Sequence, residues 1–175
     1  MKKIAILGAS GHGKVVAELA ELCGYSVVFF DDRYPTIKSN EHWKVAGSIN
    51  DLLLKKNQYK DAVIAVGNNK VRTNLFNLLS NERFEFPVLC HPKAIVSKYA
   101  SINSGTVIFA GAVINAFVKI GFNCIVNTGA IVEHDCIVGN GVHLSPNVSL
   151  AGGTKVGDST WLGIGSVTKQ LVEIG

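Results

Sequence analysis

An aliphatic residue recurs at every sixth position through most of the second half of the chain. The series is Ile102, Ile108, Ile114, Ile120, Val126, Val132, Val138, Leu144, Leu150, Val156 and Leu162. Four residues beyond each of these comes a short side chain: Thr106, Ala112, Val118, Cys124, Ala130, Cys136, Val142, Val148, Thr154, Thr160 and Ser166. A period of six matches neither the 3.6-residue turn of an α-helix nor the 3.5-residue repeat of a coiled coil. A repeat of fixed length indicates a solenoid.

The repeat predicts a three-sided solenoid with one six-residue segment on each side and eighteen residues in each coil. The aliphatic and short side chains are expected to point inward and to stack on their equivalents one coil away. Cys124 and Cys136 fall on the short inward position, so both are predicted to fill the core and not to act as nucleophiles. Asn or Gly often follows the aliphatic residue directly, and we expect these residues to adopt the left-handed backbone of the corners. They are Asn103, Asn115, Gly121, Asn127, Gly139, Gly157 and Gly163.

Residues 1–90 have a different pattern, in which apolar strands alternate with amphipathic helices. Strands are expected at 3–7, 26–30 and 61–66, and helices at 14–23, 49–56 and 69–80. The apolar sides of two helices are predicted to be Val15, Val16, Leu19 and Leu22, and Val71, Leu75, Leu78 and Leu79. Alternation of this kind indicates a small parallel, Rossmann-like sheet with covering helices. The chain is therefore predicted to hold an α/β domain at 1–90 and a β-helix domain at 91–175.

Composition narrows the class of ligand. The chain has 17 basic and 13 acidic residues, a net charge of +4, and no run of lysine or arginine. This disfavours nucleic-acid binding and suits an anionic small molecule. No stretch is long and apolar enough for a membrane span, and the N-terminal apolar run stops too early for a signal peptide. The four cysteines lack zinc-site spacing, so we expect reduced thiols, no metal and a cytoplasmic location.

Several motifs occur in a characteristic order. Gly-Ala-Ser-Gly-His-Gly spans 8–13, Asp31-Asp32 follows, Ala-Val-Gly-Asn-Asn spans 65–69 ahead of Arg72, and Glu-His-Asp-Cys spans 133–136. With the hexapeptide repeat, this set resembles the nucleotide-amino-sugar acetyltransferases of the PglD, PerB, VioB and NeuD kind over essentially the whole chain. The resemblance implies a left-handed β-helix, acetyl-CoA bound along it, and a nucleotide-sugar on the N-terminal domain. It also implies a homotrimer with active sites between subunits and a role in surface glycan synthesis.

Acetyl transfer from a thioester to an amine requires positioning of the amine, removal of a proton and stabilisation of an oxyanion. The repeat places His134 on the outer surface at a corner, where residues 133–135 read Glu-His-Asp. A solvated surface histidine is the simpler alternative. The resemblance implies that His134 is the general base and that Asp135 fixes its tautomer. Glu133 is a possible second partner.

Three further residues are assigned to the donor side. Gly152 lies eighteen residues, or one coil, after His134, and the resemblance makes its N–H the oxyanion donor; an ordinary corner glycine is the alternative. His143 lies half a coil from His134 and belongs to another side of the same chain. The resemblance places it near the acetyl group across a subunit interface, although a structural histidine is the alternative. The backbone around Ile164 is implied to line the pantetheine arm.

The glycine-rich turn follows a strand and opens a helix, a setting in which backbone N–H groups bind phosphate. Its spacing is G-x-x-G-x-G and not the G-x-G-x-x-G of dinucleotide enzymes. We therefore predict a nucleotide-sugar rather than NAD, contacted by Ser10, Gly11 and Gly13. His12 is predicted to touch either this ligand or the β-helix.

Two other strand ends are assigned to the same ligand, because parallel strands of open α/β sheets bind ligands at their carboxyl ends. Asp31 and Asp32 suit ribose or base, with helix capping or a turn as the alternative. Gly67, Asn68 and Arg72 follow the third strand; Arg72 is expected either to pair with phosphate or to be a solvated helix residue.

The C-terminal segment departs from the pattern. Thr168 stands where an aliphatic residue is due, and residues 171–175 do not clearly resume the register. The resembled proteins continue for about another coil, so the acetyl-CoA pocket is expected to be shortened or incomplete. Two other functions remain open: O-acetylation of a sugar or sialic acid, and a non-catalytic nucleotide-binding scaffold.

Overall fold

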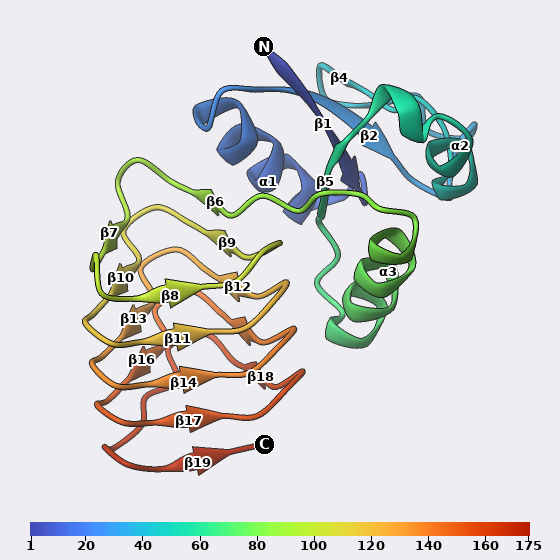
Figure 1. Ribbon diagram of the computed structural model, residues 1–175. Helices are drawn as coiled ribbons and strands as arrows, with labels where there is room; N and C mark the ends of the chain where they lie inside the picture. Colours follow the sequence, from blue (N-terminus) through green and yellow to red (C-terminus); the bar gives the residue numbers. More distant parts are fainter. The chain divides into compact units, whose positions relative to one another are not determined.

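The computed structural model describes residues 1–175, and its internal contacts divide the chain into two compact units, Met1–Pro87 and Val88–Gly175 (Figure 1). The sequence-based division at residue 90 lies three residues later. The difference arises because Leu89–Cys90 forms strand β6, which pairs with a solenoid strand. No helix in either unit combines the length and the apolar character needed to cross a membrane.

The first unit is built on a three-stranded parallel sheet with the order β2-β1-β5. The strands are β1 (Lys2–Leu7), β2 (Tyr25–Phe30) and β5 (Asp61–Ile64). The helices are α1 (Gly11–Leu22), α2 (Ile49–Leu54) and α3 (Asn69–Asn81), with a short 3₁₀ turn at Lys56–Gln58. The predicted alternation of strands and helices is confirmed.

Two features of this unit differ from the prediction. Helix α1 begins at Gly11, so residues 11–13 form its first turn and are not part of the preceding loop. The chain also forms a short antiparallel pair, β3 (Ser39–Asn40) and β4 (Trp43–Lys44), which the sequence pattern did not indicate. Strands of two residues are too short to produce a detectable alternation of apolar and polar residues.

The buried faces of the helices were predicted only in part. Val16 and Leu19 of α1 are buried, whereas Val15 is 43% exposed and Leu22 is 49% exposed. The remainder of the buried face is formed by Gly13, Ala17 and Ala20. Small residues allow α1 to lie close to the sheet, and hydrophobicity alone does not distinguish them from surface alanines. In α3, Leu79 is buried, but Val71 and Leu78 are partly exposed.

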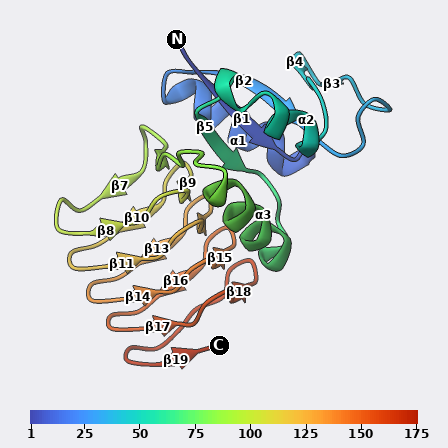
Figure 2. The same cartoon turned by 45° about the vertical axis from the view of Figure 1, so that its right-hand side comes forward.

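The second unit is a parallel β-helix whose strands form three sheets, β16-β13-β10-β7, β19-β17-β14-β11-β8 and β18-β15-β12-β9-β6. Figure 2 shows the coils stacked one below another. The strands, two residues each, are β6 (Leu89–Cys90), β7 (Ile95–Val96), β8 (Ser101–Ile102), β9 (Val107–Ile108), β10 (Val113–Ile114), β11 (Lys119–Ile120), β12 (Ile125–Val126), β13 (Ile131–Val132), β14 (Ile137–Val138), β15 (His143–Leu144), β16 (Ser149–Leu150), β17 (Lys155–Val156), β18 (Trp161–Leu162) and β19 (Glu173–Ile174). Every pairing joins residues eighteen positions apart, as in Val132 with Leu150.

The predicted interior is confirmed. Of the aliphatic series, all members from Ile108 to Val156 are at most 3% exposed, and only the terminal members Ile102 and Leu162 are half-buried. Cys124 and Cys136 are buried among them. Each fully buried aliphatic side chain contributes roughly 1.5–3 kcal/mol, so this continuous column dominates the stability of the unit.

The predicted position of the left-handed corner residues is wrong. Positive φ angles occur three residues after each aliphatic residue and not directly after it. The residues concerned are Gly105, Gly111, Phe117, Asn123, Gly129, Asp135, Gly141, Asn147, Gly153, Ser159, Gly165 and Leu171. Glycine occurs directly after the aliphatic residue for another reason, which is the close spacing of neighbouring coils. A Cβ on Gly139, for example, would lie only 2.8 Å from the backbone nitrogen of Asp158.

The register does not fail at the C-terminal end. Thr168 takes the inward position, where its hydroxyl accepts a hydrogen bond from the Ala151 N–H at 2.9 Å and lies 3.1 Å from the Thr154 hydroxyl. Beyond it, β19 pairs with β17, so that Ile174 lies on Val156 in the original register. A threonine fits this position because its partners inside the coil are also polar.

Candidate functional site

His134 and Asp135 form a hydrogen-bonded pair in the turn after β13. Nδ1 of His134 lies 2.8 Å from Oδ2 of Asp135, and the two side chains are 64% and 63% exposed. A carboxylate only accepts hydrogen bonds, so the neutral imidazole carries its proton on Nδ1. Nε2 is then the basic nitrogen, which is the arrangement that a general base requires.

Gly152 lies directly against the imidazole of His134. A Cβ added to Gly152 would be 2.7 Å from both Cε1 and Nε2 of the ring. The neighbouring coils are held in this register by the hydrogen bond from Gly153 N–H to the carbonyl of His134, at 2.9 Å. The predicted placement of Gly152 one coil beyond His134 is therefore what the structure shows, and any larger residue would displace the ring.

The backbone N–H of Gly152 donates to no protein group. Gly152 itself lies next to the basic edge of the imidazole, on the side of the later coils. An unused donor within reach of a reacting carbonyl is what an oxyanion site requires. Glu133, by contrast, directs its Oε2 toward the backbone N–H of His134 at 3.4 Å and makes no contact with the ring nitrogens.

His143 lies on β15, on a different side of the β-helix from β13. Its Nε2 is 3.3 Å from Nδ2 of Asn127, and its ring stacks on Trp161 with centroids 6.1 Å apart. Trp161 donates through Nε1 to the Ser145 hydroxyl at 2.8 Å. Since the Asn127 amide is a donor, Nε2 of His143 is the acceptor of this pair. Asn127 was expected from the sequence only as a corner residue; the signal for its contact with His143 was its place in the preceding coil, sixteen residues earlier.

Two large apolar side chains are exposed on or just after the strand that pairs with the strand of His143. Trp161 is 69% exposed and Ile164, in the following turn, is 77% exposed. Large exposed apolar side chains gathered on one surface mark a site of contact with a ligand or with another chain. The predicted donor-side residues His143 and Ile164 thus lie on one surface, whereas His134 lies on another side of the same chain.

In the first unit, the glycine-rich loop is tightly constrained by its own backbone. Gly8 has a φ of +103°, and a Cβ on Gly13 would lie 2.3 Å from the Gly8 carbonyl oxygen. Ser10 is the N-cap residue of α1, but its hydroxyl caps no backbone N–H. The N-terminus of α1 therefore has no side-chain cap, and its first-turn N–H groups are in a setting that favours binding of an anion.

Asp31 holds this loop in place. Its Oδ2 accepts from the Ala9 N–H at 2.8 Å, and Arg33 donates to both carboxylate oxygens and to the Ala9 carbonyl. Hydrogen bonds from Arg33 lower the pKa of Asp31 to about 2. Both oxygens of Asp31 already have protein partners, so its principal contact is with the loop. Asp32 accepts from the Ile49 N–H at 3.2 Å, at the start of α2.

Burial excludes one of the two alternatives that the sequence suggested for Arg72, namely a solvated helix residue. Arg72 is 1% exposed and is not a surface cation. Its guanidinium donates to the carbonyls of Val66 and Gly67 and to Oδ1 of Asn69. Asn68 caps α3 by accepting from the Val71 N–H at 3.1 Å. A buried cation needs acceptors for its N–H groups. These three acceptors of Arg72 belong to residues 66–69, so Arg72 holds this loop in its conformation.

His12 lies in the first turn of α1, in the same unit as Arg72. Burial, together with the positive charge of Arg72, lowers the pKa of His12 to about 4. The imidazole is therefore neutral at pH 7, and a ligand placed against it meets a hydrogen-bonding group and not a cation.

The depressed pKa of His12 predicts a decrease in stability in mild acid. The unfolded chain takes up the proton near pH 6.5, whereas the folded chain resists it down to about pH 4. The free energy of unfolding is thus expected to fall as the pH drops from 6.5 to 4, by at most about 3 kcal/mol. Urea titrations across this range measure the decrease. His12→Gln should remove this contribution and make the pH dependence shallower, and an unchanged slope in that variant would contradict the assignment.

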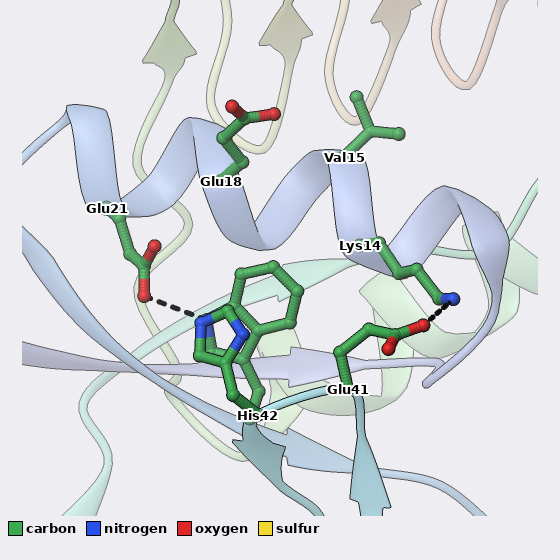
Figure 3. A pocket seen from close by; sticks show the side chains of 7 residues that line it. Lys14, Val15, Glu18, Glu21, Glu41 and His42 are labelled. Atoms are coloured by element: carbon green, nitrogen blue, oxygen red, sulfur yellow. Dashed lines mark hydrogen bonds and ion pairs between the residues drawn. The ribbon is translucent and has the colours of Figure 1, made fainter.

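A pocket with a volume of about 390 Å³ lies elsewhere in the first unit, between one side of α1 and the β3–β4 hairpin (Figure 3). It is bounded by Glu18 and Val15 and by an ion pair between Lys14 and Glu41, and Glu21 accepts from Trp43 Nε1 at 2.8 Å. None of the predicted site residues lines it.

Comparison with known proteins agrees with this architecture. Residues 3–79 match the family described as the PglD N-terminal domain. The acetyltransferase domain of PglB from Neisseria gonorrhoeae, solved in complex with acetyl coenzyme A, is 36% identical; the match covers 99% of this chain and 96% of that one, with a TM-score of 0.84. The chain belongs to the nucleotide-amino-sugar N-acetyltransferase family. The predicted fold class, a small α/β domain followed by a left-handed parallel β-helix, is confirmed.

Two other members of the family are similar. UDP-N-acetylbacillosamine N-acetyltransferase of Bacillus subtilis (strain 168) is 41% identical over 114 residues, which cover 63% of this chain and only 52% of that protein. The structure of PerB from Caulobacter crescentus in complex with CoA and GDP-perosamine is 29% identical, covers 100% of this chain and 95% of that one, and has a TM-score of 0.81. The relatives thus include proteins named for UDP-linked and for GDP-linked sugars.

Proposed function

We propose that this chain transfers the acetyl group of acetyl-CoA to the 4-amino group of a nucleotide-linked 4-amino-4,6-dideoxy sugar. The observation that carries the proposal is the His134–Asp135 pair whose imidazole lies against Gly152. The proposed setting is cytoplasmic synthesis of a precursor for surface glycans.

In the proposed mechanism, the sugar amine attacks the thioester carbonyl directly. Nε2 of His134 accepts a proton from the amine as the C–N bond forms, and Asp135 stabilises the resulting imidazolium. The Gly152 N–H donates to the oxyanion of the tetrahedral intermediate. Collapse of the intermediate breaks the C–S bond, and the imidazolium returns the proton to the leaving thiolate. The products are the acetamido sugar and free CoA, and no group becomes attached to the enzyme.

The nucleotide is proposed to bind to the first unit through the open N-terminus of α1. Ser10, Gly11 and Gly13 offer backbone N–H groups to phosphate, and His12 offers a neutral imidazole. Asp32, Gly67 and Asn68 remain proposed contacts, whereas Asp31 and Arg72 act by shaping the two loops. The Bacillus relative is named for a UDP-linked sugar, which supports UDP over dTDP as the carrier.

The part of the donor site formed by His143 and Ile164 is proposed to come from a second copy of the chain in a homotrimer. His134 and the surface that carries His143, Trp161 and Ile164 lie on different sides of one β-helix. A neighbouring chain that presents this surface to His134 would complete the site. In this arrangement Trp161 and the backbone at Ile164 line the pantetheine arm, and His143 lies near the acetyl group.

A thiol-release assay with acetyl-CoA tests the function. We expect turnover with UDP- or dTDP-linked 4-amino-4,6-dideoxyhexoses and much weaker turnover with the GDP-linked forms. Mass spectrometry of the product should show one added acetyl group on nitrogen, stable to mild alkali. An alkali-labile ester would instead identify an O-acetyltransferase. Absence of thiol release with every acceptor would favour the non-catalytic scaffold.

A further inference from the structure

The turn stack that carries His134 and Asp135 differs from the other turns in its left-handed residues. At these positions the β-helix uses glycine or asparagine except at Phe117, Asp135, Ser159 and Leu171. Three of these four, at 117, 135 and 171, lie in the same stack at intervals of one or two coils. Asp135 belongs to the proposed catalytic pair, so the other two require their own explanation.

Phe117 is energetically unfavourable at its position in the turn. Its φ is +63°, and a left-handed backbone costs a residue with a Cβ about 1–2 kcal/mol. Burial does not repay this cost, because Phe117 is 59% exposed. Its ring stacks on Tyr99, one coil earlier, with centroids 5.5 Å apart and an angle of 22° between the planes, and Tyr99 is itself 57% exposed. The two rings form an aromatic shelf (Tyr99 and Phe117) held open to solvent.

The aromatic shelf adjoins the proposed catalytic pair. The Asp135 N–H donates to the carbonyl of Ala116 at 3.1 Å, so residues 116 and 117 lie one coil before 134 and 135. Gly152 lies on the opposite side of the imidazole, one coil later. If the thioester carbonyl lies at Gly152, the acceptor must approach His134 from the earlier coils. There the turn residue one coil before His134 is Ala116, with only a methyl side chain, and the residue one coil before Asp135 is Phe117.

We propose that the aromatic shelf binds the apolar face of the acceptor sugar and selects a 6-deoxy sugar by contact with its methyl group. This inference rests on the proposed function and adds the residues that determine specificity. An aromatic face excludes water and gives favourable contact to C–H groups. A hydroxyl on carbon 6 would lose its water there without gaining a partner, and this disfavours the 6-hydroxy sugar.

Phe117→Asn tests the proposal without endangering the fold, because asparagine tolerates the left-handed backbone. We expect an unchanged or raised melting temperature and an unchanged KM for acetyl-CoA. The KM for the 6-deoxy acceptor should rise about 10-fold, and the preference for it over the 4-amino 6-hydroxy analogue should fall by a similar factor. The matched control is Phe122→Asn, which removes another exposed aromatic ring from a different turn stack and should change neither quantity.

Two outcomes would overturn the proposal. One is an unchanged acceptor KM and an unchanged 6-deoxy preference in Phe117→Asn. The other is dissociation of the oligomer in this variant, measured by light scattering, with equal losses for both acceptors; the shelf would then be a contact between chains. Failure of the proposed function is distinguishable, because it would appear as absence of turnover in the unsubstituted protein with every acceptor.

Discussion

Replacing His134 with alanine is expected to lower kcat for acetyl transfer by about 100- to 10,000-fold, the contribution of a positioned general base. The melting temperature should hardly change, because the side chain is 64% exposed and its only side-chain partner is the equally exposed Asp135. Initial rates of thiol release across acceptor concentrations, with thermal melting in parallel, provide the measurement. Asp135→Asn should cost less, since an exposed carboxylate orients the imidazole but is screened by water.

The matched control is His42→Ala. His42 is exposed on the β3–β4 hairpin, where its ring lies tilted against that of Trp43 with centroids 4.1 Å apart, and it belongs to neither proposed binding site. Its removal should leave kcat and both KM values unchanged. If His134→Ala retained the rate of the unsubstituted enzyme, acetyl transfer would not depend on this histidine, and the catalytic assignment would fail.

Gly152→Ala is expected to lower kcat by about 100- to 1,000-fold, because the added methyl group displaces the general base. The added Cβ would lie 2.7 Å from Nε2 of His134, closer than any tolerated contact. Because the imidazole is exposed, it can rotate away, so the protein should fold. The same rotation would break the 2.8 Å contact with Asp135 and move the base away from the amine. Thiol-release kinetics and the NMR signals of the His134 ring would detect both effects.

A double-substitution cycle separates two effects of the methyl group added at Gly152. If the methyl group acts only by displacing His134, Gly152→Ala should have almost no effect in a His134→Ala background, because effects acting through one group are not additive. Because alanine keeps the backbone N–H, a further loss of about 10-fold in that background would show that the methyl group also disturbs the oxyanion donor or obstructs the thioester. Full activity of Gly152→Ala in the unsubstituted background would contradict the requirement for a residue without a side chain against His134.

The sequence predicted the β-helix to the level of individual side chains, because each coil repeats the same local backbone. Once Ile114, Val132 and Leu150 share a column, the residues between them are placed as well. This is why His134 and Gly152 were correctly expected to lie one above the other. The position of the left-handed residues was predicted wrongly because asparagine and glycine occur at two places in the repeat. Three residues after the aliphatic residue they provide the positive φ angle, whereas directly after it glycine leaves room for the next coil.

The first unit was predicted less completely, because no repeat constrains it. The alternation of strands and helices was evident, yet the buried face of α1 consists largely of glycine and alanine. Arg72 carries a charge that normally indicates the surface, but it lies in the interior with its donors on backbone carbonyls of its own loop. Such contacts depend on where the loop passes, and a pattern of hydrophobicity contains no information about that path.

The sequence by itself determined that an imidazole and an adjacent carboxylate stand on an outer turn of a β-helix with a glycine one coil beyond. It did so because an eighteen-residue coil converts distance along the chain directly into position in space. Only the tertiary structure decided that Nδ1 of His134 faces Asp135 and that Nε2 lies against Gly152. The direction of a side chain depends on rotamers and on the atoms of neighbouring coils, which the spacing of residues along the chain does not encode.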